Sequence, residues 1–127
     1  MNKENFEKVK ELVKEKLGSF SNLTKFKIGK TDDCDNRFSN GYQGEGYDNL
    51  LILACGSPKT INEGEKLLID YFRNHPDWKD KCTNERGGGG GNENASYLYL
   101  AVDYKVDNIE CLDEGLYQEE WEPVNLD

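Results

Sequence analysis

Two stretches of the chain place apolar residues at the three- and four-residue spacing of an amphipathic helix. In the first, residues 3–17, the stripe consists of Phe6, Val9, Leu12, Val13 and Leu17. The other face pairs acids with lysines at helical distances, in Glu4/Lys8, Glu7/Lys10 and Glu11/Lys14. This pattern predicts a helix that packs by one face and stops at Gly18.

A second helix is predicted over residues 61–75. Thr60 and Glu63 have the spacing of a capping box at its start, and Pro76 disfavours helix in the residue before it. One stripe of this helix consists of Ile61, Glu65, Leu68 and Phe72, with Leu67 and Tyr71 alongside. We therefore expect the Glu65 carboxylate on the face that meets the rest of the core.

Three segments have the patterns of β-strands. Residues 25–29 read as a short strand that ends at a glycine, and the apolar run 49–55 predicts a central strand buried on both faces. In residues 96–104 the apolar Leu98, Leu100 and Val102 alternate with a second set of side chains that includes Asp103. This period of two predicts a half-buried strand. Together with the helices, these strands predict a small α+β domain in which a central sheet is flanked by helices.

The remaining segments are expected to be short helices or loops. Residues 32–40 predict a short helix or helical turn, capped by Thr31 or Asp32, that presents Arg37. The polar stretch 76–95 contains five consecutive glycines at 87–91, and we expect it to be a flexible loop.

Charge divides the chain unevenly. Its formal net charge is −9, which argues against a general nucleic-acid binder because phosphate neutralisation requires Lys and Arg. Residues 1–31 nevertheless hold eight Lys and four Glu, whereas residues 107–127 hold eight acids and no Lys or Arg. We expect an N-terminal helix at 1–18, an α+β domain at 19–106, and an acidic tail at 107–127 that docks by a few side chains.

Composition also bears on compartment. No apolar run approaches 18 residues, so no membrane-spanning helix is expected. The N-terminus lacks an apolar signal region, so we expect an intracellular protein, cytoplasmic or nuclear. The four cysteines form no C-x-x-C unit, which favours free thiols. The chain has one histidine, His75, which we expect in solvent at a helix end.

A carboxylate on a core-facing stripe raises the question of its partner. Without a cation or a metal beside it, a buried Glu65 would cost several kcal/mol. The neighbouring Gly64 suggests close approach of backbone or ligand. Arg37 is the cation that we expect. The pair is either a catalytic site or a structural ion pair, and the remaining alternative is that Glu65 lies at the edge of the stripe and reaches water.

The segment Lys27-Ile28-Gly29-Lys30-Thr31-Asp32-Asp33, with Arg37 ten residues after Lys27, resembles the second half of the GIY-YIG nuclease signature. It is similar to the phage-type branch, in which Lys-Ile-Gly-Lys-Thr stands where other members have Tyr-Ile-Gly. The order that follows also agrees: an arginine-bearing helix, an apolar strand, and a helix with Glu65 seven residues before Phe72. The resemblance covers about residues 20–104 and implies a GIY-YIG-like fold that cleaves phosphodiester bonds in nucleic acid.

The resemblance also implies roles for individual residues. Arg37 would stabilise the phosphate charge, and Glu65 would bind Mg²⁺ or another divalent metal. Lys27 stands in the position of the second tyrosine, and Tyr42 or Tyr47 in the glycine-punctuated loop would supply the hydroxyl that helps to activate water. The residues expected to bind substrate are Lys25, Lys30, Thr31 and Asn94.

Two other interpretations remain open. Gly18-Ser19-Phe20 offers a phenylalanine where the first half of the signature ends in tyrosine. This favours a catalytically degenerate domain of the same fold that binds a protein or nucleic-acid partner. The acidic composition is consistent with a third interpretation, an inhibitor or DNA mimic. The presence of both Arg37 and Glu65 favours the enzyme, because a degenerate domain has no need for a carboxylate on its core stripe.

Overall fold

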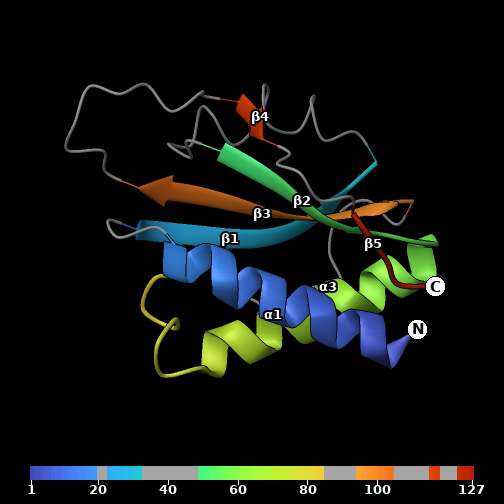
Figure 1. The fold of residues 1–127 in the computed structure, drawn as a ribbon, viewed down its shortest axis with the longest axis horizontal. Helices are drawn as coiled ribbons and strands as arrows, with labels where there is room; N and C mark the ends of the chain where they lie inside the picture. Colours follow the sequence, from blue (N-terminus) through green and yellow to red (C-terminus); the bar gives the residue numbers. More distant parts are fainter. Residues whose placement is uncertain (20–22, 33–48, 85–93, 105–114, 118–122) are drawn as a thin grey trace.

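The structure is a computed structural model that describes residues 1–19, 23–32, 49–84, 94–104, 115–117 and 123–127. Two helices, α1 (Lys3–Ser19) and α3 (Pro58–Asn74), lie side by side on one face of a sheet (Figure 1). The strands of this sheet are β1 (Leu23–Thr31), β2 (Asn49–Cys55), β3 (Tyr97–Tyr104), β4 (Gly115–Tyr117) and β5 (Val124–Asn125). The α+β class predicted from the sequence is confirmed.

The sheet is organised around β3. The strand order is β1-β3-β2-β4, and β3 runs antiparallel to both β1 and β2. The other edge of β2 is shared, because β4 pairs in parallel with residues 49–51 and β5 with residues 54–55. The prediction that residues 49–55 form an interior strand is confirmed. Residues 107–127, expected as a tail, supply both β4 and β5 to the sheet.

The main core lies between the sheet and the two helices. It contains Phe26 and Ile28 of β1, Leu51 and Leu53 of β2, Leu98, Leu100 and Val102 of β3, and the helical stripes Val9, Val13, Leu17 and Ile61, Leu68, Phe72. A smaller cluster on the far face consists of Leu50, Tyr99 and Ala101. The prediction of a half-buried β3 is therefore wrong. As the middle strand, β3 has a partner on both edges and buried side chains on both faces.

The start of α3 differs from the sequence-based prediction. The helix begins at Pro58 with Ser57 as its N-cap, so Thr60 lies inside the first turn and is not the cap. Proline suits the first helical position because its missing N–H has no partner there in any helix. The Thr60 hydroxyl lies 3.0 Å from the Ser57 hydroxyl instead. The helix ends at Asn74, as expected from Pro76.

Residues 75–84 return along the free edge of β1. The Phe26 N–H donates to the Lys81 carbonyl at 2.9 Å, and the Thr83 N–H donates to the Phe26 carbonyl at 2.9 Å. The Asn84 side chain then imitates one more backbone unit, accepting from the Ile28 N–H at 2.9 Å and donating to the Ile28 carbonyl at 2.8 Å. Residues 76–84 therefore do not form the flexible loop that was predicted there, and the glycine run lies outside the described residues.

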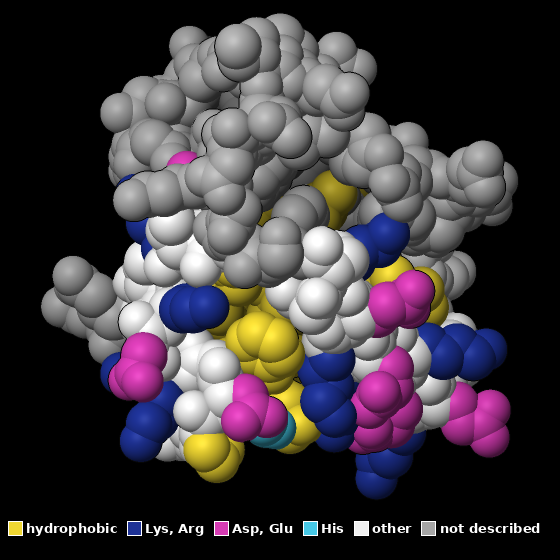
Figure 2. Space-filling view, turned by 60° about the vertical axis from the view of Figure 1, so that its left-hand side comes forward, with side chains coloured by type: hydrophobic (Ala, Val, Ile, Leu, Met, Phe, Trp, Pro, Cys, Tyr) yellow, Lys and Arg dark blue, Asp and Glu magenta, His cyan; other side chains and the backbone are white. Residues whose placement is uncertain are grey.

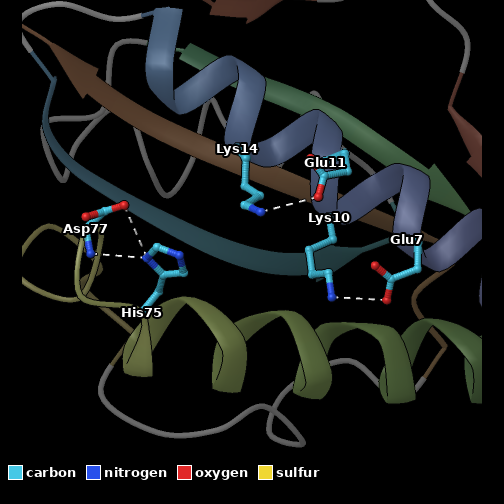
Figure 3. A network of polar contacts seen from close by, with 6 residues as sticks. All are labelled: Glu7, Lys10, Glu11, Lys14, His75 and Asp77. Carbon is cyan, nitrogen blue, oxygen red and sulfur yellow. Dashed lines mark hydrogen bonds and ion pairs between the residues drawn. The ribbon is translucent and has the colours of Figure 1, made fainter.

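The helices meet along a seam of aromatic and charged side chains. Lys10 and Lys14 of α1 pair with Glu7 and Glu11 at 3.0 and 3.3 Å, as the helical spacing predicts (Figure 3). Both ammonium groups also lie over the Tyr71 ring of α3, at 4.7 and 5.7 Å from its centroid. A hydrogen bond to Tyr71, and to a smaller extent one to Glu11, raises the pKa of Lys14 above its ordinary value.

His75 is not in solvent, as had been expected, but half-buried at the end of α3. Its ring centroid lies 5.4 Å from that of Tyr71. Its Nδ1 atom accepts a hydrogen bond from the Asp77 N–H at 3.1 Å (Figure 3). The His75 side chain thus closes the turn after α3.

The described surface mixes charges of both signs. In the view of Figure 2, basic and acidic side chains alternate around a band of exposed hydrophobic side chains. None of the described helices is long and apolar enough to cross a membrane.

Candidate functional site

The candidate site lies where the end of β1 meets the first turns of α3. Lys30, near the end of β1, is only 8% exposed, and Glu65 of α3 is 6% exposed. Lys30 shares a strand face with Phe26 and Ile28, which are part of the core beneath the helices. The two charged side chains therefore belong to the same layer of the molecule.

Asn62 connects the strand to the helix at this point. Lys30 Nζ donates a hydrogen bond to Asn62 Oδ1. Asn62 precedes Glu65 by three residues on α3, so the two side chains are neighbours on the helix surface, with Cβ atoms about 5–6 Å apart. A cation, an amide and a carboxylate are thus gathered beside the last residues of β1.

The burial of Glu65 decides between two of the alternatives for this residue. At 6% exposure it does not reach water at the edge of the stripe. The Glu65 carboxylate is also not without a partner, because Glu65 takes part in a polar or electrostatic interaction. In the described residues, every buried side-chain nitrogen or oxygen has a hydrogen-bond partner. Arg37, its expected partner, lies outside the described residues, so their pairing stays a prediction.

Gly64 has a structural explanation. A Cβ atom at this position would lie 3.2 Å from a methyl group of Leu98 and 3.2 Å from a methyl group of Leu126. The close approach that the sequence suggested is thus made by core side chains of β3 and of the segment after β5.

The structure does not bring Lys27 to Glu65. Lys27 is paired with Ala101, whose side chain belongs to the cluster on the far face of the sheet. Lys25, Gly29 and Thr31 alternate onto that same face. The expected site residues of β1 are therefore divided, with Lys30 on the helix side and Lys25, Lys27 and Thr31 on the other.

Gly29 is required by its cross-strand partner on this far face. It is paired with Tyr99, and a Cβ atom at residue 29 would overlap the Tyr99 ring and hydroxyl. The glycine of the Lys-Ile-Gly-Lys-Thr motif thus makes room for a buried aromatic ring.

The three remaining site residues expected from the sequence are Tyr42, Tyr47 and Asn94, of which the structure describes Asn94. Tyr42 and Tyr47, like Arg37, belong to the segment 33–48 that the structure does not describe. Asn94 is exposed. The Ser96 N–H donates to the Thr31 carbonyl at 3.2 Å, so the segment that carries Asn94 approaches the end of β1.

Two asparagines of this region were not predicted to take part in the site. Asn62 binds Lys30, and Asn84 binds the backbone of Ile28 two residues before Lys30. Neither position carries a local signal, because an asparagine on a helix surface or in a polar loop is ordinary. The sequence offers one indirect indication for Asn62, because it precedes Glu65 by three residues and so neighbours it on a helix.

The residues present fit a metal ion only in part. The described residues contain no group of three or more His, Cys, Asp or Glu side chains that could hold a metal. Mg²⁺ is commonly bound by one or two carboxylates together with substrate phosphates and water. Glu65 fits that arrangement as a carboxylate that would share the ion with a substrate.

The thiols of Cys55 and Cys82 are free. Burial raises the pKa of the Cys82 thiol, and burial together with the charge of Asp127 raises that of Cys55. A raised pKa lowers the thiolate fraction, so neither residue is suited to act as a nucleophile.

No protein-family model, no curated protein and no solved structure matches this chain. The resemblance to GIY-YIG nucleases therefore rests on the quoted motifs, and a function has to be argued from the site itself.

Proposed function

We propose that the protein is a metal-dependent nuclease that cleaves phosphodiester bonds beside the end of β1. The observation that carries the proposal is the burial of Lys30 and Glu65 on facing elements, with Asn62 between the strand and the helix. Burying a charge is costly, so such groups are generally paired or functional. Lys30 is bonded to a neutral amide, which leaves its positive charge available to an anion.

The polar groups of this junction suit a phosphodiester. Lys30, and Arg37 from the segment that follows β1, would balance the charge of the phosphate, for which a guanidinium has matching geometry. Glu65 would hold a divalent metal such as Mg²⁺. When bound, the metal supplies Lewis-acid stabilisation at a phosphoryl oxygen. We propose Tyr42 or Tyr47 as the hydroxyl that orients water.

The proposal is tested by cleavage assays with plasmid DNA and structured RNA in Mg²⁺ and in Mn²⁺. Glu65→Gln keeps the shape of the side chain and removes its charge, and Arg37→Ala removes the guanidinium. We expect each variant to lose cleavage by at least about 100-fold, the scale of removing one group that stabilises transition-state charge.

Glu63→Gln is the matched control, because Glu63 is an exposed carboxylate two residues away on the same helix. It should cleave at the wild-type rate. Equal losses in Glu63→Gln and Glu65→Gln would count against a metal at Glu65. The absence of cleavage by the wild type with any metal would refute the enzyme outright.

One observation favours a second function, a degenerate domain of this fold that binds a partner. Lys27 stands in the position of the second tyrosine of the signature, yet it lies on the face of the sheet opposite to Glu65. If the wild type binds nucleic acid or a protein partner but cleaves nothing, this alternative replaces the nuclease.

A further inference from the structure

Lys30 is a nearly buried ammonium group with unused hydrogen-bonding capacity. An ammonium has three donors. Among the described residues, Lys30 Nζ donates to Asn62 Oδ1 and forms no ion pair with a carboxylate of these residues. A cation that is 8% exposed is costly to bury with one neutral acceptor. The arrangement indicates a site that an anion completes.

The chemistry of the two groups fixes the orientation of the Asn62 amide. An ammonium donates and cannot accept, so it must face the amide oxygen. The Asn62 nitrogen, with two donors, is therefore turned away from Lys30. This nitrogen has no acceptor among the described residues, and Asn62 is half-exposed. In the proposed site, these donors point to a ligand that binds beside Lys30.

We infer that Asn62 is a positioning residue in a phosphate-binding site, where it holds Lys30 Nζ and donates a second hydrogen bond to the phosphate. The inference rests on the proposed function in one respect, namely that the phosphate belongs to a polynucleotide backbone. A phosphate oxygen accepts strong hydrogen bonds from charged donors. Asn62 fits this role because a neutral amide orients the ammonium without cancelling its charge, as a carboxylate would.

The test measures binding without cleavage, by fluorescence anisotropy of labelled oligonucleotides in the presence of a metal chelator. Duplex DNA, single-stranded DNA and single-stranded RNA are titrated over a series of KCl concentrations, and inorganic phosphate is added as a competitor. Lys30→Met should weaken binding about 10- to 100-fold, the range for a hydrogen bond to a charged group. On duplex DNA it should reduce the slope of log K against log salt by about 0.9.

Asn62→Asp is the decisive variant. It is nearly isosteric, but its carboxylate would neutralise Lys30 and repel phosphate, so it should weaken binding at least as much as Lys30→Met. Asn74→Asp adds the same charge near the other end of α3 and serves as the control, with little effect expected. In Asn62→Ala the affinity should fall, and adding Lys30→Met should then cost less than it does in the wild type. Thermal melting confirms that each variant folds.

The outcomes separate this inference from the proposed function. Equal effects of Asn62→Asp and Asn74→Asp, additive effects of Asn62→Ala and Lys30→Met, or an unchanged salt slope would each overturn the role of Asn62. Binding of inorganic phosphate, measured directly by isothermal titration calorimetry, in a protein that binds no oligonucleotide would limit the site to free phosphate and refute the polynucleotide. Binding that behaves as expected in a protein that never cleaves would refute the nuclease and leave the phosphate site intact.

Discussion

The Asp127 carboxylate caps α3 from a position 70 residues away from Ser57. Its Oδ1 and Oδ2 atoms accept the Ser57 N–H at 3.1 and 2.8 Å, and Oδ1 accepts the Ser57 hydroxyl at 2.9 Å. Ser57 makes no side-chain cap bond of its own to the helix. A negative charge is favourable at this end because the first N–H groups of a helix give it partial positive charge.

This contact predicts a pH-dependent contribution to stability. Hydrogen bonds from the Ser57 hydroxyl, the Thr60 hydroxyl and the Ser57 N–H lower the pKa of Asp127 below its ordinary value of 3.8. A lowered folded-state pKa gives stability that is present above the unfolded value and is lost as pH falls through the folded value. Asp127→Asn should therefore lower the urea midpoint at about pH 6 and have a smaller effect at about pH 3.

Asp80→Asn, in the turn after α3, is the control for this measurement. It removes an equal charge from an exposed carboxylate that lies away from the start of α3. A deficit in Asp127→Asn that is the same at both pH values would mean that the carboxylate charge is not the source of the effect.

Leu126 anchors the same segment in the core. Its side chain is fully buried, and its N–H donates to the Cys55 carbonyl at 2.9 Å. Leu126→Ala should lower the free energy of unfolding by about 2–5 kcal/mol, because it removes buried methyl groups and leaves a cavity beside Gly64. Chemical denaturation measures the loss. Leu67→Ala, at an exposed leucine of α3, should change stability by less than about 0.5 kcal/mol.

Gly29→Ala should destabilise the protein by about 1–3 kcal/mol, because the new methyl group would overlap the Tyr99 ring. Replacing the ring in Tyr99→Ala should make the Gly29→Ala change much less costly, so the two substitutions are expected to be non-additive in a double-mutant cycle. Gly18→Ala is the control, since a Cβ at that position meets no atom within 4 Å. Strict additivity of the first pair would contradict the contact.

Asn84→Ala should open the edge of β1. The Ile28 N–H would lose its acceptor and its carbonyl would lose its donor, at a cost of about 1–3 kcal/mol. Hydrogen exchange locates the effect, since the Ile28 amide should exchange faster. The amide of Phe26 keeps its bond to Lys81 and should respond less. Uniformly faster exchange of both amides would instead indicate that the whole edge depends on Asn84.

Local periodicity was enough to predict the elements that pack by a repeating face. The apolar run at 49–55 gave the bounds of β2, and the stripe through Ile61 and Phe72 placed Glu65 on the buried face of α3. In both cases the residues that signal the element are also those that bury it, so the sequence contains the information within one short window.

The contacts that join distant segments could not be predicted in this way. Asp127 caps a helix across 70 residues, and Asn84 binds Ile28 across 56. The residues that flank Asp127 and Asn84 in the sequence form no motif that would indicate these contacts. The candidate site shows the same limit. The burial of Glu65 follows from its stripe, whereas the bond between Lys30 and Asn62 depends on how β1 lies against α3.

The position of β3 between β1 and β2 has a consequence for the order of assembly during synthesis. β1 and β2 make no ladder with each other, so neither has its antiparallel partner until residues 97–104 have left the ribosome. The capping contact at the start of α3 likewise forms only after Asp127 has been made. Most of the chain must therefore be made before β1 can form its ladder with β3, although the shorter edge contact between Phe26 and residues 81–83 can form earlier. Loop closure over such separations favours slow folding. Until then, the apolar residues of the early strands stay open to chaperones and to other chains.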